Sequence, residues 1–388
     1  MTSSDMIYLD HAATTPLALE VLATMLPYLE HDYGNPSSTH RAGRVAREGV
    51  ERSREQVAAA VDVDPLDVLF TSGGTEADNQ AVKGIAWAAR EADRGAHVVT
   101  TAIEHHAVLD AATWLRDTQG FDVTIVPVGG DGVVDPQQLL DSVTDETVLV
   151  TVMAANNEVG TVQPLDVIGP ELAERGVCLH TDAVQAFGRT PLPLDAWHIG
   201  AMSLSAHKFN GPMGVGVLVL RRDVPAVPVL HGGGQERGVR SGTFNTPGIV
   251  GCGAAAELTA AGAADEIDRL RSLRDTLIAG LCAIDGVDLN GSPTARLPHN
   301  AHIAVQGCDG DALMTALDTA GVCASTGSAC QSGAAAPSHV LAAVGAAVDC
   351  AHVRLTCGRT TTAADAESAV ERIDGAIAEL RAAGGGFF

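Results

Sequence analysis

The segment "AMSLSAHKFNGPMGVGVLVL", residues 201–220, places two short β-rich runs on either side of a lysine and a Gly-Pro turn. Similar runs precede it: DVLFTS, HVVTTA, DVTIVPV, TVLVTVMAAN and VCLHTDA, separated by Ala-rich stretches and by turns of Gly, Pro or Asp. Such alternation over residues 65–220 is typical of an α/β fold around a mostly parallel sheet with helices on both faces. Ligands of such sheets gather at the carboxyl ends of the strands, so we expect the functional site there.

A second, smaller unit is expected after the sheet. A long helix is indicated by one apolar stripe, formed by Ile267, Leu270, Leu273, Leu277 and Leu281. Beyond it the sequence predicts a strand at AHIAVQ, a helix opening at Asp309, a strand at HVRLT and a closing helix after TTTAADAE. We therefore predict a large domain over residues 15–260. Residues 1–14 and 261–388 are predicted to form a small α+β domain.

The chain is strongly acidic. Its 388 residues carry a formal net charge of −24, which argues against nucleic acid or an anionic membrane as the main partner. The acidic excess, the scarcity of lysine and the low aromatic content are typical of a halophilic protein, because a salt-rich cytoplasm screens the self-repulsion.

The cysteines and the first residues indicate a reducing compartment. Eight cysteines are spread singly, with no CxxC pair, so a disulfide framework is not expected. The start, MTSSDMIYLDHAATTP, has neither the basic nor the apolar region of a signal peptide, and no apolar run is long enough to span a membrane. We expect a cytoplasmic protein.

Lysine is nearly absent from the chain. Lysine and arginine together number 24, and Lys83 and Lys208 are the only lysines, which leaves 22 arginines. An arginine stays protonated in a protein, whereas a partly desolvated lysine amine can become neutral and nucleophilic. The lysine kept at 208, before a Gly-Pro turn, therefore suggests covalent chemistry.

Asp182 in HTDAVQ directly follows an apolar run, where a strand would end. Alone it is an ordinary strand-end carboxylate. Lys208 lies 26 residues later, and we place it at the end of the next strand but one. A lysine that binds pyridoxal phosphate covalently usually comes with a carboxylate on the pyridine nitrogen. Gln185 could then hydrogen-bond the ring hydroxyl.

Two further motifs allow more than one interpretation. In FTSGGTEADNQAVKG a strand, a glycine turn and a helix could cradle a phosphate, although such a turn is more often only a cap. In AIEHHAVLD, His105 and His106 suggest a metal, but no third ligand lies at a useful spacing in the sequence. A histidine stacked on a flat cofactor ring and a solvent-facing helix start both remain open.

Cys330 lies in a stretch of small residues, CASTGSACQSGAAAPSHV. Small residues favour an accessible loop, and an accessible thiol is the kind that reacts. The alternative is a buried cysteine that acts as a small hydrophobe, which is our interpretation of the other seven. A bond between Cys323 and Cys330 is not expected in a reducing cytosol.

Together these stretches resemble the cysteine desulfurases, in the class V aminotransferase family of fold-type I pyridoxal phosphate enzymes. The resemblance covers almost the whole chain. The stretches that carry it, in order, are YLDHAATTP, GNPSSTHRAG, TSGGTEADNQAVKG, EHHAV, NNEVGTVQP, HTDAVQ, SAHKFNGPMGVGVL, HGGGQERGVRSGT, STGSAC and VRLTCG. The spacing after GSAC is similar to that of the NifS and IscS branch, which has a long cysteine loop, here about residues 323–338.

The resemblance implies a role for each matching residue. Lys208 would bind the cofactor covalently and then move protons, His105 would stack on the ring as a possible acid or base, and Cys330 would attack the substrate sulfur. The other implied cofactor ligands are Asp182, Gln185 and Asn157 around the ring, and Gly74, Thr75, Ser205, His207 and a second subunit's Thr243 at the phosphate. The implied substrate ligands are Asn35, Asn157 and Arg354, an arginine being suited to a carboxylate.

The resemblance also implies a reaction and partners. The sulfur of L-cysteine would pass to Cys330 as a persulfide, leaving L-alanine, in a homodimer that hands the sulfur to an acceptor such as an iron–sulfur scaffold. No resident metal is implied, although Cys330 would transiently contact a nascent iron–sulfur cluster. The short C-terminus lacks the longer tail of some bacterial members, which leaves the docking of a scaffold open.

Other functions remain as alternatives. A selenocysteine lyase, a cysteine-sulfinate desulfinase or another enzyme of the same fold would be favoured by loss of Cys330, which is present. A nicotinamide-dependent oxidoreductase needs a G-x-G-x-x-G turn, which TSGGTEA does not match. A non-catalytic protein of this fold would be expected to have lost Lys208 or Asp182.

Overall fold

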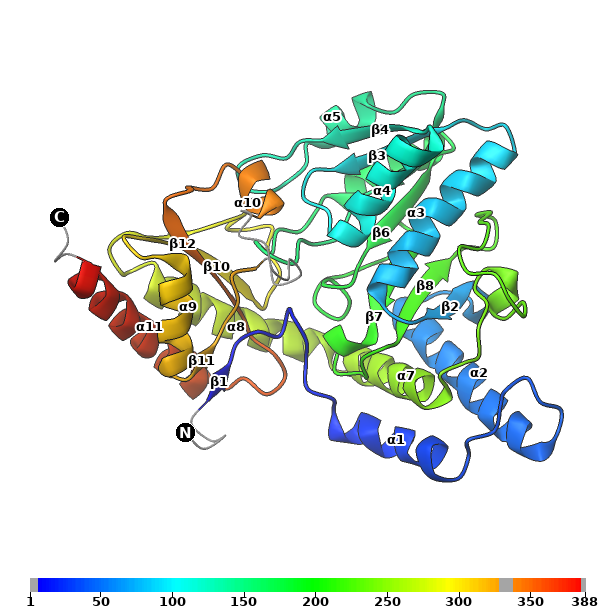
Figure 1. The fold of residues 1–388 in the computed structure, drawn as a ribbon, viewed down its shortest axis with the longest axis horizontal. Coiled ribbons are helices and arrows are strands. Elements are labelled where there is room, and N and C mark those ends of the chain that lie inside the picture. Colours follow the sequence, from blue (N-terminus) through cyan, green and yellow to red (C-terminus); the bar gives the residue numbers. More distant parts are fainter. Residues whose placement is uncertain (1–5, 328–337, 385–388) are drawn as a thin grey trace.

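The computed structural model describes residues 6–327 and 338–384. Its largest sheet has seven strands in the order β2-β8-β7-β6-β5-β3-β4 (Figure 1). The strands are β2 (Val68–Thr71), β3 (His97–Thr101), β4 (Asp122–Val126), β5 (Thr147–Thr151), β6 (Cys178–Asp182), β7 (Ile199–Ser205) and β8 (Gly216–Leu220). Only β8 runs antiparallel to its neighbours in this sheet. Every run of residues that the sequence predicted as a strand between 65 and 220 forms one, and the α/β fold class is confirmed.

Helices cover both faces of this sheet because its strands are apolar on both sides. Consecutive strand residues, such as Val68 and Leu69 in β2 or Leu149 and Val150 in β5, point to opposite faces and belong to two different apolar clusters. One cluster includes α3 (Gly74–Glu91) and α4 (His106–Gln119). The other includes α1 (Leu19–Glu30), α2 (Arg41–Val61), α5 (Pro136–Asp141), α6 (Leu165–Glu174) and α7 (Thr246–Ala261).

A smaller unit stands beside the large sheet, at the left of Figure 1. It has an antiparallel sheet of β12 (Cys350–Thr356), β10 (Asn300–Gln306) and β9 (Val287–Leu289), and a parallel pair of β1 (Ile7–Tyr8) and β11 (Val322–Cys323). Its helices are α8 (Ala263–Leu281), α9 (Gly310–Thr319), α10 (His339–Ala343) and α11 (Ala363–Gly384). In α8 the predicted stripe is buried from Leu270 to Leu281, while Ile267 is half-buried.

A third apolar cluster supports the predicted division into domains. It joins Ile7 and Leu9, near the start of the chain, to residues between Leu270 and Ile377. The N-terminal strand therefore packs with the C-terminal unit rather than with the large sheet. The bounds 15–260 and 1–14 with 261–388 stay a prediction. Among the described residues, no helix is both long and apolar enough to cross a lipid bilayer.

Candidate active site

Two neighbouring parallel strands end at the same edge of the large sheet and carry the first site residues. β6 ends at Asp182, which pairs with Ser203 of β7. Lys208 closes a single 3-10 turn, Ala206–Lys208, that follows β7 directly. The sequence-based placement of Lys208 one strand further along was wrong, because the strand that precedes Lys208 is the next strand after β6. Asp182 and Lys208 consequently lie on adjacent strands.

The two lysines have different surroundings. The amine of Lys208 donates to the carbonyl oxygens of Ala12 at 2.5 Å and Ala13 at 2.8 Å, so the segment after β1 reaches the edge of the large sheet. The amine of Lys83 instead lies 4.7 Å from the centre of the Trp114 ring, in a cation–π contact between α3 and α4. Only Lys208 lies at the carboxyl edge of the strands.

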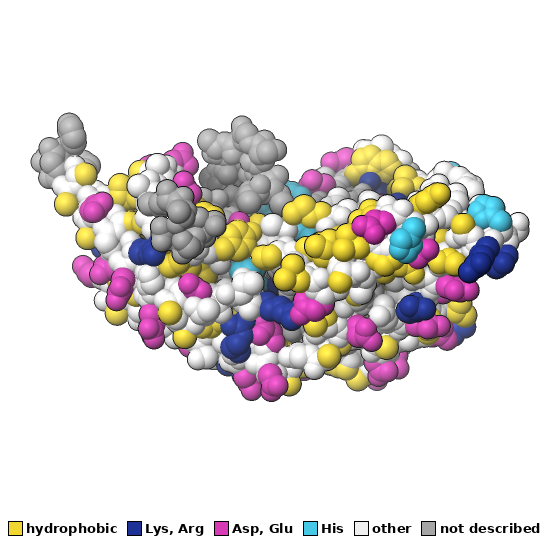
Figure 2. Space-filling model, turned by 90° about the horizontal axis from the view of Figure 1, so that it is seen from below, with side chains coloured by type: hydrophobic (Ala, Val, Ile, Leu, Met, Phe, Trp, Pro, Cys, Tyr) yellow, Lys and Arg dark blue, Asp and Glu magenta, His cyan; other side chains and the backbone are white. Residues whose placement is uncertain are grey.

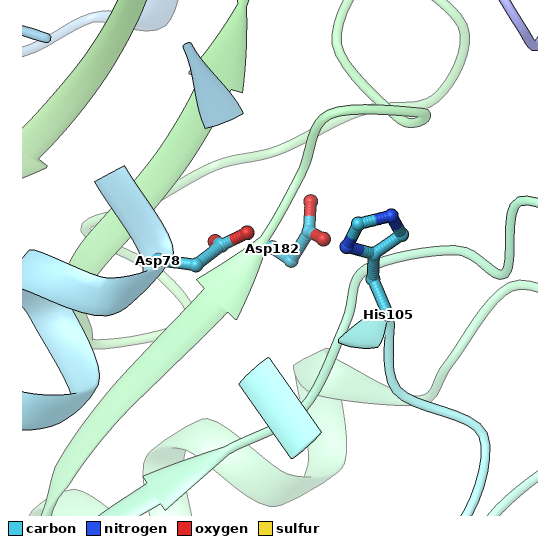
Figure 3. Close-up of side chains that lie close together, drawn as sticks. All are labelled: Asp78, His105 and Asp182. Carbon is cyan, nitrogen blue, oxygen red and sulfur yellow. The ribbon is translucent and has the colours of Figure 1, made fainter. Parts of the chain in front are cut away.

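Asp182 is the central carboxylate of this edge. Its Oδ1 accepts a hydrogen bond of 2.9 Å from the backbone N–H of Val184. Figure 3 shows Asp182 between Asp78, from α3, and His105, and one side-chain oxygen or nitrogen of each lies within 4.8 Å of the others. Burial raises the pKa of Asp182, while nearby His105, the Val184 N–H and Lys208 act against this shift.

His105 is the N-cap of α4, and its Nδ1 accepts a hydrogen bond of 3.1 Å from the backbone N–H of Ala107. His105 is thus at a helix start and also beside Asp182. A position at a helix start is therefore compatible with a histidine that stacks on a cofactor ring. His106 points elsewhere: its Nδ1 lies 3.2 Å from Asp110, and its ring centre lies 4.6 Å from that of His339. The paired histidines therefore do not converge on one point.

The start of α3 has room for an anion. No side chain caps the helix at Gly73, and a Cβ added at Gly73 would meet no atom within 4 Å. At Gly74 a Cβ would lie 2.9 Å from Val184 Cγ2 and 3.5 Å from Ser205 Cβ, so no larger residue fits there. Backbone N–H groups at such a helix start bind phosphate readily.

Three further predicted phosphate and ring ligands are Thr75, His207 and Gln185. Thr75, in the first turn of α3, is exposed. The Nδ1 of His207 lies 3.1 Å from Thr14 Oγ1, and burial, followed by the charge of Lys208, lowers the pKa of His207 to about 4, so its ring is neutral. Gln185 donates to the Ala12 carbonyl at 2.9 Å, and its buried Oε1 has no hydrogen-bond partner.

These features together test whether pyridoxal phosphate fits. The site offers a lysine amine, a carboxylate beside it, an uncapped helix start with open space, and a buried amide oxygen that no described group satisfies. A flat, phosphorylated ring with a polar edge matches this set of donors and acceptors. The residues present fit the cofactor.

Arg354, the predicted carboxylate ligand on β12, is 2% exposed. Its Nη2 donates to Asp10 Oδ1 at 2.8 Å, and its Nη1 donates to the backbone oxygen of Asn157 at 2.9 Å and lies 3.4 Å from that of Gly327. Its buried Nε has no hydrogen-bond partner among residues 6–327 and 338–384. Arg354 and Asn157 are therefore together, and an acidic side chain already occupies one arm of the guanidinium.

Asn35 is not near Arg354 within this chain. The loop between α1 and α2 that carries it lies at the opposite end of the molecule from β12 (Figure 1). Asn35 is exposed, and its Oδ1 accepts from the backbone N–H of Ser37 at 2.9 Å. This loop and residues 233–235 line the same cavity of about 310 Å³.

Thr243 is also exposed, in a loop that two ion pairs fix to the large domain. Glu236 is buried and accepts two hydrogen bonds from Arg54 of α2, at 2.8 and 2.9 Å. Arg240 donates to both oxygens of Glu76 in α3, at 2.6 and 3.2 Å. The loop is thus held firmly while Thr243 points away from its own chain's core.

Cys330 lies outside the described residues. The nearest described residues on either side, Gly327 and Ser338, both lie beside the site. Gly327 is close to Arg354, and the hydroxyl of Ser338 donates to Glu158 Oε2 at 2.6 Å. Glu158 directly follows Asn157 in the sequence.

Sequence reasoning missed three acidic residues at this site. Asp10 and Asp78 lie inside quoted motifs, and Glu104 directly precedes His105. Glu104 is fully buried and accepts from Thr101 Oγ1 at 2.7 Å and from the Met153 N–H at 3.0 Å, and burial raises its pKa to about 8. A signal for Asp78 was present, because it interrupts an otherwise apolar helix face beside Ala77, Ala81 and Val82.

A cavity of about 940 Å³ lies at the other edge of the sheet, where β6 and β7 begin. Two of its arginines are already paired with acidic side chains, since Arg221 contacts Asp195 and Asp67, and Arg222 contacts Asp64. Cys178 also lines this cavity, but burial raises the pKa of its thiol to about 12. Lys208, Asp182 and His105 are at the carboxyl edge, so we assign the active site there.

Comparisons with known proteins match almost the whole chain. The family model described as "Aminotransferase class-V" matches residues 7–368. The chain is 44% identical to a cysteine desulfurase IscS of Methanosarcina thermophila, covering 98% of this chain and 94% of the relative. It is 47% identical to an IscS-like cysteine desulfurase of Mycobacterium tuberculosis, covering 97% and 98%. Among solved structures, a NifS-like protein matches with a TM-score of 0.90 at 34% identity, covering 97% of this chain and all of that one.

Proposed function

This chain belongs to the class V aminotransferase family, and from that premise we propose that it is a pyridoxal-phosphate-dependent cysteine desulfurase of the IscS type. The observation that carries the proposal is the placement of Lys208 and Asp182 at the ends of adjacent strands, beside the uncapped start of α3. This cofactor requires three groups: an amine that bonds to it covalently, a carboxylate that pairs with the ring nitrogen, and a site that binds its phosphate.

The cofactor would be held by residues from five segments of this chain and by one residue of the partner subunit. Lys208 would bind it covalently, Asp182 would hold a proton on the ring nitrogen, and His105 would stack on the ring. Gln185 and Asn157 approach the ring hydroxyl, and the phosphate ligands are Gly74, Thr75, Ser205, His207 and the partner subunit's Thr243. When bound, pyridoxal phosphate supplies an electron sink that stabilises negative charge on the substrate α-carbon.

The chain's own residues then perform three steps. Lys208 takes the α-proton of L-cysteine at its Nζ. The Cys330 thiolate attacks the substrate sulfur: a sulfur–sulfur bond forms, the Cβ–Sγ bond breaks, and the electron pair of that bond stays with Cβ, which is then protonated. Lys208 returns its proton to Cα, so that the products are L-alanine and a persulfide on Cys330. The position of Gly327 and Ser338 beside Arg354 and Glu158 supports this role.

The substrate carboxylate is bound by Arg354, whose planar guanidinium suits it. Asn157 lies next to Arg354 and would contact the same substrate. Because Asn35 lies at the far end of its own chain, we propose that it serves the site of the partner subunit, as Thr243 does.

A homodimer is supported by one exposed face. In and just after α1, Leu19, Leu22, Leu26, Leu29 and Tyr33 are between 36% and 79% exposed and repeat at helical spacing. Figure 2 shows hydrophobic side chains gathered on the side of the molecule where α1 lies. The cavity shared by the Asn35 loop and the Thr243 loop shows that these two loops are neighbours. A second copy on this face would bury the apolar stripe and receive both loops.

The persulfide sulfur would pass to an acceptor protein such as an iron–sulfur scaffold, with Cys330 in transient contact with the nascent cluster. The excess of acidic residues supports a salt-rich cytoplasm as the place of action, since screening there weakens the repulsion among them.

The function is tested by incubating the purified protein, loaded with pyridoxal phosphate, with L-cysteine and a thiol reductant. Alanine and sulfide should appear in equal amounts. The matched control is Lys208→Arg, which keeps the charge and should produce neither product. Turnover of L-cysteine that gives no alanine would disprove the proposal.

A further inference from the structure

Arg189 has none of the roles assigned above, yet its guanidinium is hydrogen-bonded to the main chain of two proposed cofactor ligands. Its Nη2 donates to the backbone oxygen of Lys208 at 2.8 Å, and its Nη1 donates to that of Gln185 at 3.2 Å. Gln185 lies in the turn after β6, and Lys208 lies in the turn after β7. One side chain therefore ties together the two segments that leave neighbouring strands at the carboxyl edge of the sheet.

The side chains of the same two ligands meet at one acceptor. The amine of Lys208 donates to the backbone oxygen of Ala12 at 2.5 Å, and the amide of Gln185 donates to the same oxygen at 2.9 Å. Lys208 and Gln185 are thus linked twice, through their main chains by Arg189 and through their side chains by Ala12. The two Nη atoms of a guanidinium have a fixed separation, so Arg189 sets the spacing of the two backbone oxygens.

Packing alone does not hold these segments. Lys208 and Arg189 both line a cavity of about 460 Å³, to which the large unit contributes Leu258 of α7 and the small unit contributes Leu270 of α8. Atoms that face a cavity lack packing contacts on that side. The hydrogen bonds from Arg189 must therefore supply part of the restraint that packing does not.

The acceptors that Arg189 binds are neutral, although its charge is buried. Arg189 is 9% exposed, and no carboxylate among residues 6–327 and 338–384 forms an ion pair with it. Burial lowers its pKa to about 10, while the charge of Glu266 acts against this shift. A buried cation without an anionic partner is costly, and an apolar side chain would fill the same space without that cost. The charged side chain is therefore explained by its hydrogen bonds to the two backbone oxygens.

We propose that Arg189 is a positioning residue: it donates to the backbone oxygens of Lys208 and Gln185 and so fixes the spacing between the amine and the amide that serve the cofactor. The proposal rests on the proposed function, because this spacing matters only if Lys208 binds the cofactor covalently and Gln185 approaches its ring hydroxyl. Arg189 acts through these two residues rather than on the cofactor itself.

The first test asks whether Arg189 restrains the Lys208 amine, and it needs no activity. The full-length protein, freed of cofactor, is labelled with acetic anhydride, and mass spectrometry compares Lys208 with Lys83 as the internal reference. Rates measured over a range of pH give the rate constant of the neutral amine, so a change in position is separated from a change in pKa. In Arg189→Met, which has a similar length but cannot donate, this constant should rise at least threefold for Lys208 and stay unchanged for Lys83.

Arg274→Met is the matched control. Arg274 is also 9% exposed and donates to the backbone oxygen of Leu297 at 3.2 Å, but within the described residues it forms no hydrogen bond to a proposed cofactor ligand. Its loss should leave the labelling of Lys208 unchanged. If Arg189→Met also leaves it unchanged, the proposal is wrong, whatever the protein catalyses.

The second test asks what the restraint does in the loaded protein. Arg189 forms no hydrogen bond to Arg354 or Asn157 in the described part of the chain, so substrate binding should depend little on it. We expect Arg189→Met to lower kcat roughly tenfold with KM changed less than twofold, and to shift the pH dependence of the cofactor absorbance. Arg189→Lys keeps the charge and can still donate, so it should recover part of each loss.

Two outcomes would overturn the proposal: wild-type kcat and absorbance in Arg189→Met, or an Arg189→Lys variant no better than Arg189→Met. Absence of a cofactor absorbance in the wild type would instead contradict the proposed function alone.

Discussion

Arg354 on β12 donates through Nη2 to Asp10 Oδ1 at 2.8 Å, so an acidic side chain from the segment after β1 occupies the proposed carboxylate ligand. The arginine side chain is 3% exposed and that of Asp10 is 20% exposed. The pair is thus open to solvent on the acidic side. An incoming substrate carboxylate must compete with Asp10 for the same guanidinium.

Replacing Asp10 tests this competition. In Asp10→Asn the guanidinium has no anionic partner to displace, so KM for L-cysteine should fall roughly three- to tenfold, the equivalent of about 1 kcal/mol for a partly exposed ion pair. The protein should also be less stable, because a buried arginine loses its counter-charge. Steady-state kinetics and thermal unfolding measure the two effects. Asp268→Asn, which removes an exposed partner of Arg271, is the control for net charge. An unchanged or raised KM would mean that Asp10 does not compete with the substrate.

Lys208 should be the only lysine that carries the cofactor. Borohydride reduction of the loaded protein should fix a pyridoxyl group on the peptide that contains Lys208. Lys83 should stay unlabelled, since its amine lies against the Trp114 ring and away from the carboxyl edge. Mass spectrometry of a proteolytic digest locates the adduct, and label on Lys83 would refute the assignment.

The proposed sharing of sites predicts complementation between two inactive subunits. Lys208→Ala and Thr243→Ala homodimers should both be inactive. After exchange of subunits, hybrid dimers have one complete site, so an equal mixture should recover about a quarter of wild-type activity. A mixture of Lys208→Ala with Lys208→Arg is the control and should recover none. If the first mixture also recovers none although exchange is demonstrated by labelling, Thr243 does not serve the partner.

Cys330→Ser separates sulfur abstraction from cofactor chemistry. Lys208, Asp182 and His105 do not depend on the thiol, so the variant should bind the cofactor and respond to L-cysteine by a change in absorbance. It should form no alanine, sulfide or persulfide, because a serine hydroxyl is not ionised at neutral pH. The control is Cys323→Ser, which should keep its activity. Desulfuration by Cys330→Ser at close to the wild-type rate would leave a different lyase as the better assignment.

Glu104 should make stability depend on pH. Burial raises its pKa to about 8, so between about pH 4.5 and 8 the folded protein keeps a proton that the unfolded chain releases. The stabilisation is present at low pH and is lost as pH rises, by about 1.4 kcal/mol per pH unit. Glu104→Gln does not titrate, so its free energy of unfolding relative to the wild type should rise from pH 5 to 8. Urea unfolding at four pH values measures the difference, and parallel pH curves would contradict it.

Local sequence patterns predicted the large sheet because its strands are short β-branched runs, all except the edge strand β4 largely buried, which differ sharply from the Ala-rich helices between them. The covalent chemistry of Lys208 could also be predicted from the sequence, since it depends only on the side chain being a lysine. The sheet order was not readable. The placement of Lys208 one strand too far from Asp182 was a miscount along the chain, since AMSLSA is the first predicted strand after VCLHTDA. In the structure β7 follows β6 directly both in the chain and in the sheet.

The missed residues depend on partners far away in the sequence. Asp10 contacts Arg354, which lies 344 positions later, and Asp78 lies close to Asp182 on a different element. Neither contact follows from local spacing. Asn35 was predicted from its motif, which resembles that of the family. In a single chain, however, its loop lies far from the strand that carries Arg354.

The ion pair between Arg240 and Glu76 joins two segments that belong to different cofactor sites in the proposed dimer. Glu76 lies in the first turn of α3, which cradles phosphate in its own subunit, and its carboxylate also accepts from the Ser72 N–H at 2.8 Å. Arg240 lies three residues before Thr243, which is proposed to reach the other subunit's phosphate. In the proposed dimer, the Arg240–Glu76 ion pair therefore connects the phosphate-binding start of α3 in one site to the loop whose Thr243 binds phosphate in the other site. In the proposed dimer, filling one site would change the affinity of the other, and the two effects would be equal in free energy by thermodynamic linkage. The dimer should take up its two cofactors cooperatively rather than independently.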